Sequence, residues 1–141
     1  MSYATKQDMI DRFGETELVQ ITNPEDRSAE TINDARLNQA LADADAEIDG
    51  YLIGRYTLPL ASTPVVLKRS ACDIARYYLY DDRATEQVTK RYDGVVTFLK
   101  SVAKGDIALS LIEAQEDTPA AAGVEIAADP RVFTRDSLKD Y

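Results

Sequence analysis

The sequence of 141 residues contains no histidine, no tryptophan and a single cysteine. A lone thiol cannot form an intramolecular disulfide, and without histidine it cannot form the Cys–His pair that activates a nucleophilic thiol. Cys72 lies within an apolar helical pattern. We therefore expect it to be buried as a small hydrophobic side chain.

Basic residues are scarce relative to acidic ones. The chain carries 16 Lys and Arg against 25 Asp and Glu, which gives a formal net charge of −9. Electrostatic capture of DNA or of an anionic membrane requires an excess of positive charge, so the composition argues against both. It is compatible with a protein that lets DNA pass without holding it.

Long hydrophobic runs are also missing. No apolar stretch approaches the ~20 residues that a membrane-spanning helix needs. The first fourteen residues, MSYATKQDMIDRFG, contain no apolar run typical of a signal peptide. We therefore expect a protein that is made in a reducing compartment and has no membrane partner.

The sequence has no motif for catalysis or cofactor binding: no Gly-rich phosphate loop, no Gly-x-Ser-x-Gly and no Cys-x-x-Cys. The acidic run at residues 43–50 fails as a calcium loop. With Asp45 as position 1, Tyr56 stands where a bidentate Glu is required, and with Asp43 first, Ile48 stands where Gly is required. We expect no metal, no cofactor and no enzymatic activity, although two acids that meet in a cleft would be an alternative. The run is then a solvated helix face or a surface shared in an oligomer.

Helical periodicity dominates what is present, and it predicts an all-α fold, a small bundle of about four to five helices. Thr5 and Asp8 form a weak capping box that opens a short helix, which Gly14 ends. A second short turn runs from Glu15 to Ile21.

Three longer helices are expected over residues 33–56, 64–82 and 85–105, the first with Thr31 as an alternative start. The second should have Thr63 as its N-cap and Pro64 at its first helical position. Glycines at 50 and 54 and a proline at 59 separate the first two of these helices. This Gly/Pro elbow should set the angle between the two main helices.

Residues 48–92 are rich in tyrosine. Stacking on single-stranded nucleic acid would also need a positive groove, and the nearby basic residues are too few and too interleaved with apolar positions to supply one. We therefore expect core and interface packing from these rings. They are Tyr51, Tyr56, Tyr77, Tyr78, Tyr80 and Tyr92.

We divide the chain into a helical domain, residues 1–112, and an extended C-terminal arm, residues 113–141. The arm is acidic and has little apolar periodicity, a composition typical of a flexible tail. Apolar residues return near its end with basic residues between them, so we expect this part to be held by a neighbouring chain. The candidate partner-binding residues are Arg131, Val132, Phe133, Arg135 and Leu138.

An ordered set of short segments runs through the chain. They are Tyr3-Ala4-Thr5, Ile48-Asp49-Gly50-Tyr51-Leu52, Gly54-Arg55-Tyr56, Leu58-Pro59-Leu60, Asp73-Ile74-Ala75-Arg76-Tyr77-Tyr78-Leu79 and Arg131-Val132-Phe133-Thr134-Arg135-Asp136-Ser137-Leu138. On these residues the chain resembles the Mu-like prophage family of small virion neck proteins. The resemblance covers nearly the whole chain and is weakest over residues 117–129.

This resemblance implies a head-to-tail adaptor of a tailed bacteriophage. Such proteins form a ring, commonly of about twelve copies, beneath the portal protein. The ring extends the DNA channel, through which DNA passes without specific binding, and docks the next neck or tail-completion protein. The expected location is the neck of the virion, after synthesis in the host cytoplasm. The alternative is a cytoplasmic binding module outside the virion, an assembly chaperone or regulator, that uses the tyrosine-rich helical face.

Overall fold

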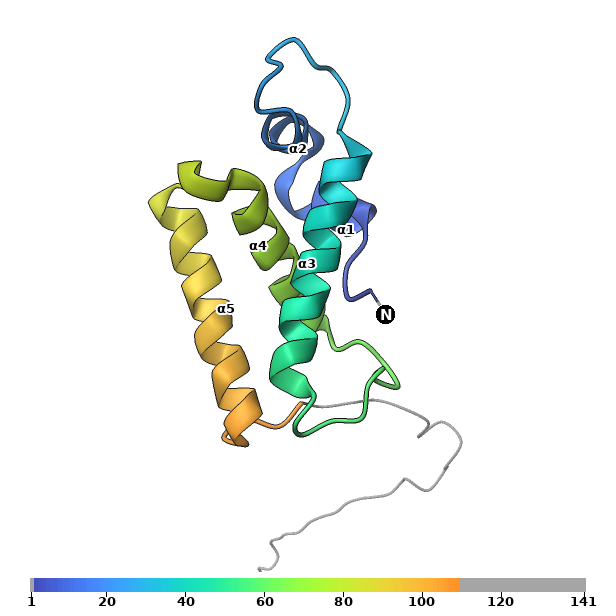
Figure 1. Cartoon of the computed structure of the whole chain (residues 1–141), viewed down its shortest axis with the longest axis vertical. Helices are drawn as coiled ribbons and strands as arrows, with labels where there is room; N and C mark the ends of the chain where they lie inside the picture. Colours follow the sequence, from blue (N-terminus) through green and yellow to red (C-terminus); the bar gives the residue numbers. More distant parts are fainter. Residues whose placement is uncertain (1, 110–141) are drawn as a thin grey trace, which may run out of the picture. The chain divides into compact units, whose positions relative to one another are not determined.

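A computed structural model describes residues 2–109 (Figure 1). Within this range the regular structure is entirely helical. The elements are α1 (Lys6–Phe13), α2 (Glu15–Thr22), α3 (Asp34–Leu52), α4 (Val65–Tyr80), the short 3-10 helix η1 (Asp81–Arg83) and α5 (Glu86–Lys104). The all-α prediction is confirmed. The proposed arm, residues 113–141, lies outside the described residues, and the domain boundary at 112 stays a prediction.

Local chemistry sets several helix ends where the sequence predicted them. The Thr5 side chain accepts a hydrogen bond from the Asp8 backbone, and the Asp8 side chain accepts one from the Thr5 backbone, which completes the capping box. Thr85 caps α5 in the same way through the Val88 N–H, at 3.2 Å. Gly105 ends α5 in a left-handed conformation with φ 92°, which glycine adopts without strain.

The helix boundaries on either side of the elbow differ from the prediction. Helix α4 begins at Val65, and its N-cap is Pro64, whose ψ of 148° is extended; Thr63 is therefore not the cap. Helix α3 ends at Leu52 with Ile53 as its C-cap, short of the predicted end. The two glycines at positions 50 and 54 weaken its last turn, so the chain leaves the helix there.

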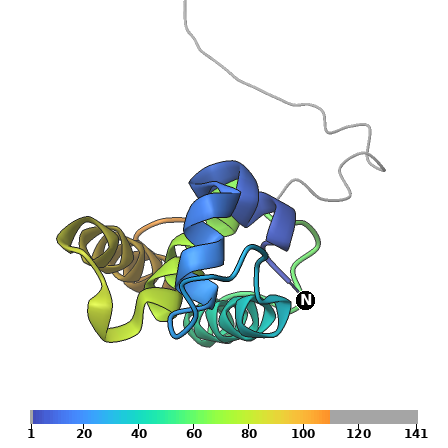
Figure 2. The same ribbon diagram turned by 90° about the horizontal axis from the view of Figure 1, so that it is seen from above.

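Helix α4 lies at the centre of the described part. It contacts α3, α5 and α2, which surround it when the bundle is seen from above (Figure 2). Half of its residues are buried, including Leu67, Ile74 and Cys72. Burial raises the pKa of the Cys72 thiol to about 11. The prediction that this cysteine is a buried packing residue is confirmed.

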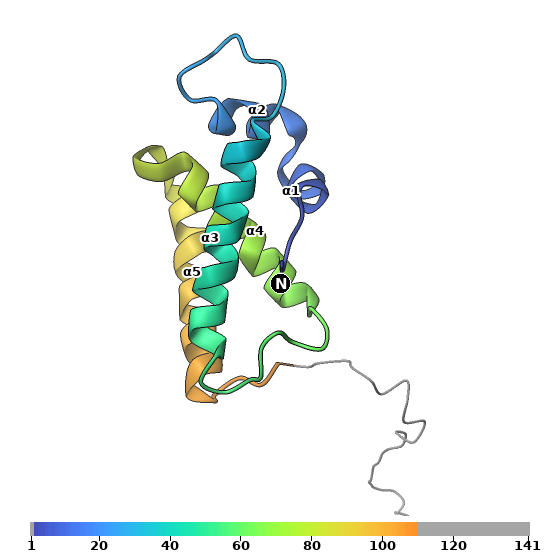
Figure 3. The ribbon, with the colours of Figure 1, turned by 45° about the vertical axis from the view of Figure 1, so that its right-hand side comes forward.

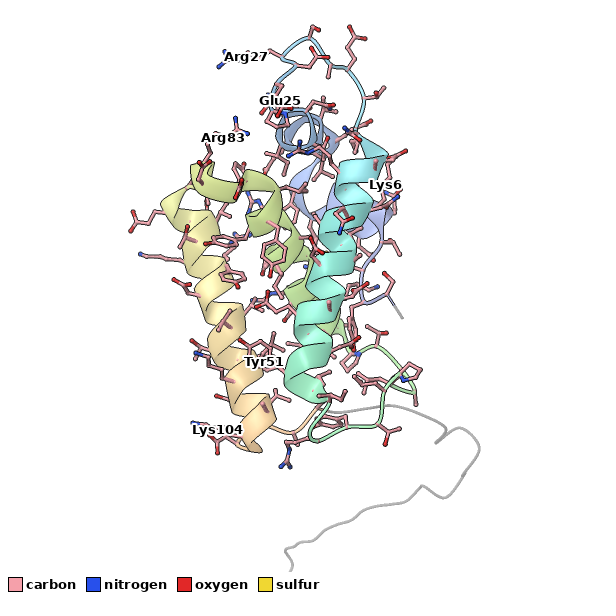
Figure 4. All side chains as sticks on the ribbon, viewed as in Figure 1. Lys6, Glu25, Arg27, Tyr51, Arg83 and Lys104 are labelled. Atoms are coloured by element: carbon pink, nitrogen blue, oxygen red, sulfur yellow. The ribbon has the colours of Figure 1, made fainter. Side chains whose placement is uncertain are left out.

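The N-terminal segment is fastened to α3. Tyr3 is buried, its backbone N–H donates to Asp45 at 3.0 Å, and its hydroxyl donates to Asp49. At the first residue of α1, the Lys6 ammonium lies 2.8 Å from the Asp34 carboxylate (Figure 4). Acids of α3 therefore hold the start of the chain against the bundle.

The Gly/Pro elbow, residues 53–64, contacts the end of α5 (Figure 3). The backbone N–H of Leu109 donates to the Tyr56 hydroxyl oxygen at 2.9 Å. The Arg55 guanidinium packs on Gly105, where a Cβ atom would lie only 2.9 Å from it. Leu60 is buried in the core and thereby anchors the elbow. The elbow therefore supports the chain where it leaves the last helix, besides joining α3 to α4.

Candidate partner-binding surfaces

A cluster of one acid and three tyrosines joins the three long helices. Glu47 of α3 accepts hydrogen bonds from the hydroxyls of Tyr78 on α4 and Tyr92 on α5, the latter at 3.0 Å. The Tyr77 ring stacks on the Tyr92 ring with centroids 4.1 Å apart and planes 6° from parallel. We call these four residues the tyrosine cluster. Glu47 and the hydroxyls of Tyr78 and Tyr92 are therefore paired with one another within the chain.

Two hydroxyls of the tyrosine cluster, those of Tyr78 and Tyr92, have raised pKa values. Burial, then the hydrogen bond to Glu47 and its charge, raise the pKa of Tyr92 to about 12. The same causes raise the pKa of Tyr78 further above its usual range. Both hydroxyls therefore remain donors at neutral pH.

The acidic run of α3 is consequently not a plain solvated face. Asp45 and Asp49 bind Tyr3, and Glu47 binds two further tyrosines. The solvated-face interpretation is wrong for these three acids because each meets a tyrosine from another part of the chain. It holds for Asp43, which is exposed.

A second polar group attaches the two short helices to α4. The Arg76 guanidinium pairs with Glu17 of α2, with Nε 2.7 Å from Oε2, and lies over the Phe13 ring of α1, 4.4 Å from its centroid. The Tyr80 hydroxyl donates to the same Glu17 oxygen at 3.0 Å. Arg76 is therefore a structural residue, fully engaged within the fold.

A groove of about 700 Å³ opens between α1, α4 and α5. Its lining combines positive charge, one buried acid and apolar surface, and we call it the arginine groove. Its main residues are Arg12, Arg69, Arg91, Asp73, Phe13, Val66, Val95 and Phe98. All three of these arginines are exposed, and none forms an ion pair with another residue in the range 2–109.

Asp73 is the acid of the arginine groove, and its side chain has no direct partner in the part of the chain that the structure describes. The residue is only 8 % exposed. Burial raises the pKa of its carboxyl, while Arg91, Arg69, Arg76 and Arg12, in decreasing order, favour the charged form from a distance. A buried carboxylate without a donor is costly to the fold. The groove therefore presents one buried carboxylate without a hydrogen-bond donor and three exposed guanidinium groups without an ion-pair partner, as far as residues 2–109 are concerned.

The structure leaves the predicted partner-binding residues untested. Arg131, Val132, Phe133, Arg135 and Leu138 all lie outside the described residues. The arginine groove, in turn, was missed by the sequence analysis. A signal for it exists in α4 and α5, where charged residues recur beside the apolar stripe at helical spacing. They are Arg69 and Asp73, one turn apart on α4, and Arg91 one turn before Val95 on α5.

Neither a metal site nor a membrane-spanning helix is found among the described residues. No group of three or more His, Cys, Asp or Glu side chains within residues 2–109 is placed to hold a metal ion. None of the helices in that range combines the length and apolarity needed to cross a bilayer.

Comparison with known proteins places the chain. The family model described as "Bacteriophage Mu, Gp36" matches residues 3–128. The chain is 38% identical over 140 residues to the Mu-like prophage FluMu protein gp36 of Haemophilus influenzae, covering 99% of this chain and 97% of that protein. It is also 38% identical over 136 residues to gene product J of Escherichia phage Mu, covering 96% of each. The chain belongs to the Gp36 family of bacteriophage Mu and Mu-like prophages.

Proposed function

We propose that this protein is a structural, non-enzymatic component of the virion neck, a head-to-tail adaptor. About twelve copies would form a ring beneath the portal protein, extend the DNA channel and dock the next neck or tail-completion protein. Membership of a phage Mu family over nearly the full length supports a role in the particle or its assembly.

The structural observation that carries the proposal is the contrast between the hydrogen-bonded acid of the tyrosine cluster and the charged groups of the arginine groove. In the tyrosine cluster, Glu47 and the hydroxyls of Tyr78 and Tyr92 are paired within the chain. The arginine groove keeps three cations and a buried acid without direct partners among the described residues. A groove that combines charged groups with apolar surface is suited to binding another protein chain through both polar and apolar contacts.

The net charge of −9 also supports the proposal. A channel wall that lets packaged DNA pass must not retain phosphates, and an acidic protomer favours weak, non-specific contact. The tyrosine face, required by the alternative of a chaperone or regulator outside the virion, is packed between helices and bound to Glu47. No observation favours that alternative.

The test is a phage or prophage in which translation of this gene is stopped, with the intact gene supplied from a plasmid as the control. We expect DNA-filled heads that lack tails or lose their genome, seen by electron microscopy, and rescue by the plasmid. Quantitative mass spectrometry of normal particles should find about a dozen copies. Infectious tailed particles without the protein, or its absence from normal particles, would contradict the proposal.

A further inference from the structure

The arginine groove specifies the chemistry of what fills it. The three exposed guanidinium groups are suited to binding carboxylates. The buried Asp73 carboxylate is suited to binding a cation or another strong hydrogen-bond donor. Between them Phe13, Val95 and Phe98 offer apolar surface. The occupant must therefore bring both signs of charge and at least one apolar side chain within a short segment.

One stretch of this chain outside the described residues has that composition. Residues 129–141 read DPRVFTRDSLKDY and alternate acids and bases around two apolar groups. Residues 110–128 do not, because they carry acids but no lysine or arginine. Such a segment could pair with the three arginines but would leave Asp73 without a cation.

We propose that the arginine groove binds residues 129–141 of a second copy of this chain. Phe133 packs on the apolar part of the groove, and Arg131 or Arg135 pairs with Asp73. Asp129 and Asp136 meet the arginines of the rim. The inference rests on the proposed ring and names the contact that joins its subunits.

The choice of a second copy follows from assembly geometry. A protomer with one groove and one matching segment makes a head-to-tail contact, and such contacts close into a ring when the rotation allows it. The nineteen residues between Leu109 and Asp129 can span up to about 65 Å when extended. That length is sufficient to reach an adjacent copy of a domain of this size.

The test is disulfide cross-linking between two full-length variants. Gly94 lies in the groove wall, and a Cβ atom built there meets nothing within 4 Å, so Gly94→Cys should be accommodated. The second variant is Thr134→Cys, next to the proposed anchor. The two are made with tags of different length and co-produced, and Cys72 stays in place because it is buried. Thr97→Cys, exposed on α5 but not in the groove, replaces Gly94→Cys in the matched control.

We expect a mixed disulfide between G94C and T134C at about five times the yield of the T97C control, in concentrated protein or in purified particles. Adding Arg91→Glu to the groove, or Phe133→Ala to the segment, should reduce that yield to the control level. Equal yields at positions 94 and 97, or no mixed disulfide in either sample, would overturn the proposal. A chain that carries both G94C and T134C would also overturn it if the disulfide formed only within that chain and never between two copies.

Failure of this inference can be separated from failure of the proposed function. If mass spectrometry finds copies of the protein in particles but the mixed disulfide does not form, only the groove contact is overturned. The mixed disulfide in purified protein, with no copies in particles, overturns the virion role and leaves the contact between copies standing.

Discussion

The tyrosine cluster and the arginine groove lie about one helical turn apart on α4. Each contains a carboxylate, but the two carboxylates differ in their hydrogen-bond partners. In the cluster, Glu47 receives two hydroxyl donors, one from Tyr78 and one from Tyr92. In the groove, Asp73 is more deeply buried than Glu47 yet has no direct donor among the described residues. The first arrangement stabilises the fold, whereas the second costs stability unless something else binds. This difference is the reason why we propose the arginine groove, and not the tyrosine cluster, as the contact between copies.

Removing the acid of the tyrosine cluster should have the largest effect. Glu47→Ala leaves two half-buried hydroxyls without an acceptor and should lower the free energy of unfolding by about 3 kcal/mol. Glu47→Gln keeps an acceptor and should cost about 1 kcal/mol. Urea unfolding followed by circular dichroism measures both. Equal losses for the two variants would show that the hydrogen bonds contribute little beyond packing.

The matching change in the arginine groove should have the opposite sign. Asp73→Asn removes a buried charge that lacks a direct partner, so the free energy of unfolding should rise by about 1 kcal/mol. The same variant should assemble less well, a trade of binding for stability. Loss of stability by D73N would mean that the distant arginines already compensate the carboxylate.

The gain from D73N should shrink in acid. Because the folded-state pKa of Asp73 is raised, the folded wild type binds a proton more readily than the unfolded chain, and its stability rises as pH falls through that pKa. The Asn variant lacks this dependence. Comparing the two unfolding curves at pH 7 and pH 4 checks the sign.

The tyrosine cluster should respond to alkali, with the smallest effect. Tyr92 has its pKa raised from 10.0 to about 12, so its contribution is complete below pH 10 and is lost as pH rises towards 12. The expected loss at pH 11 is at most about 1 kcal/mol. Tyr92→Phe should flatten this decline in thermal unfolding at pH 9, 10 and 11. An unchanged decline would assign it to other residues.

The comparison also explains what the sequence could predict. The helix ends at Thr5, Thr85 and Gly105 were predicted correctly because helix caps depend on a few adjacent residues. The α4 start was wrong by one residue because Thr63 and Pro64 are both acceptable at a helix start, and only the folded backbone chooses between them.

The candidate site depended on longer-range information. Arg12, Asp73 and Arg91 belong to three different helices, and they form one groove only because α1 and α5 flank the same side of α4. Helical periodicity identifies which residues share a face of one helix, but not which helix lies opposite. The same reason explains why Glu47 was assigned to a solvated face although it binds tyrosines of α4 and α5.

The hydrogen bond from the Leu109 backbone to Tyr56 has a mechanical consequence. A force applied to the chain beyond residue 109 would reach the elbow first, where Leu60 is buried and Arg55 packs on Gly105. The load would then be shared between the connections of α3, α4 and α5 instead of unwinding α5 from its free end. In the ring that we propose, a subunit pulled by its neighbour would in this way resist the force with its whole bundle.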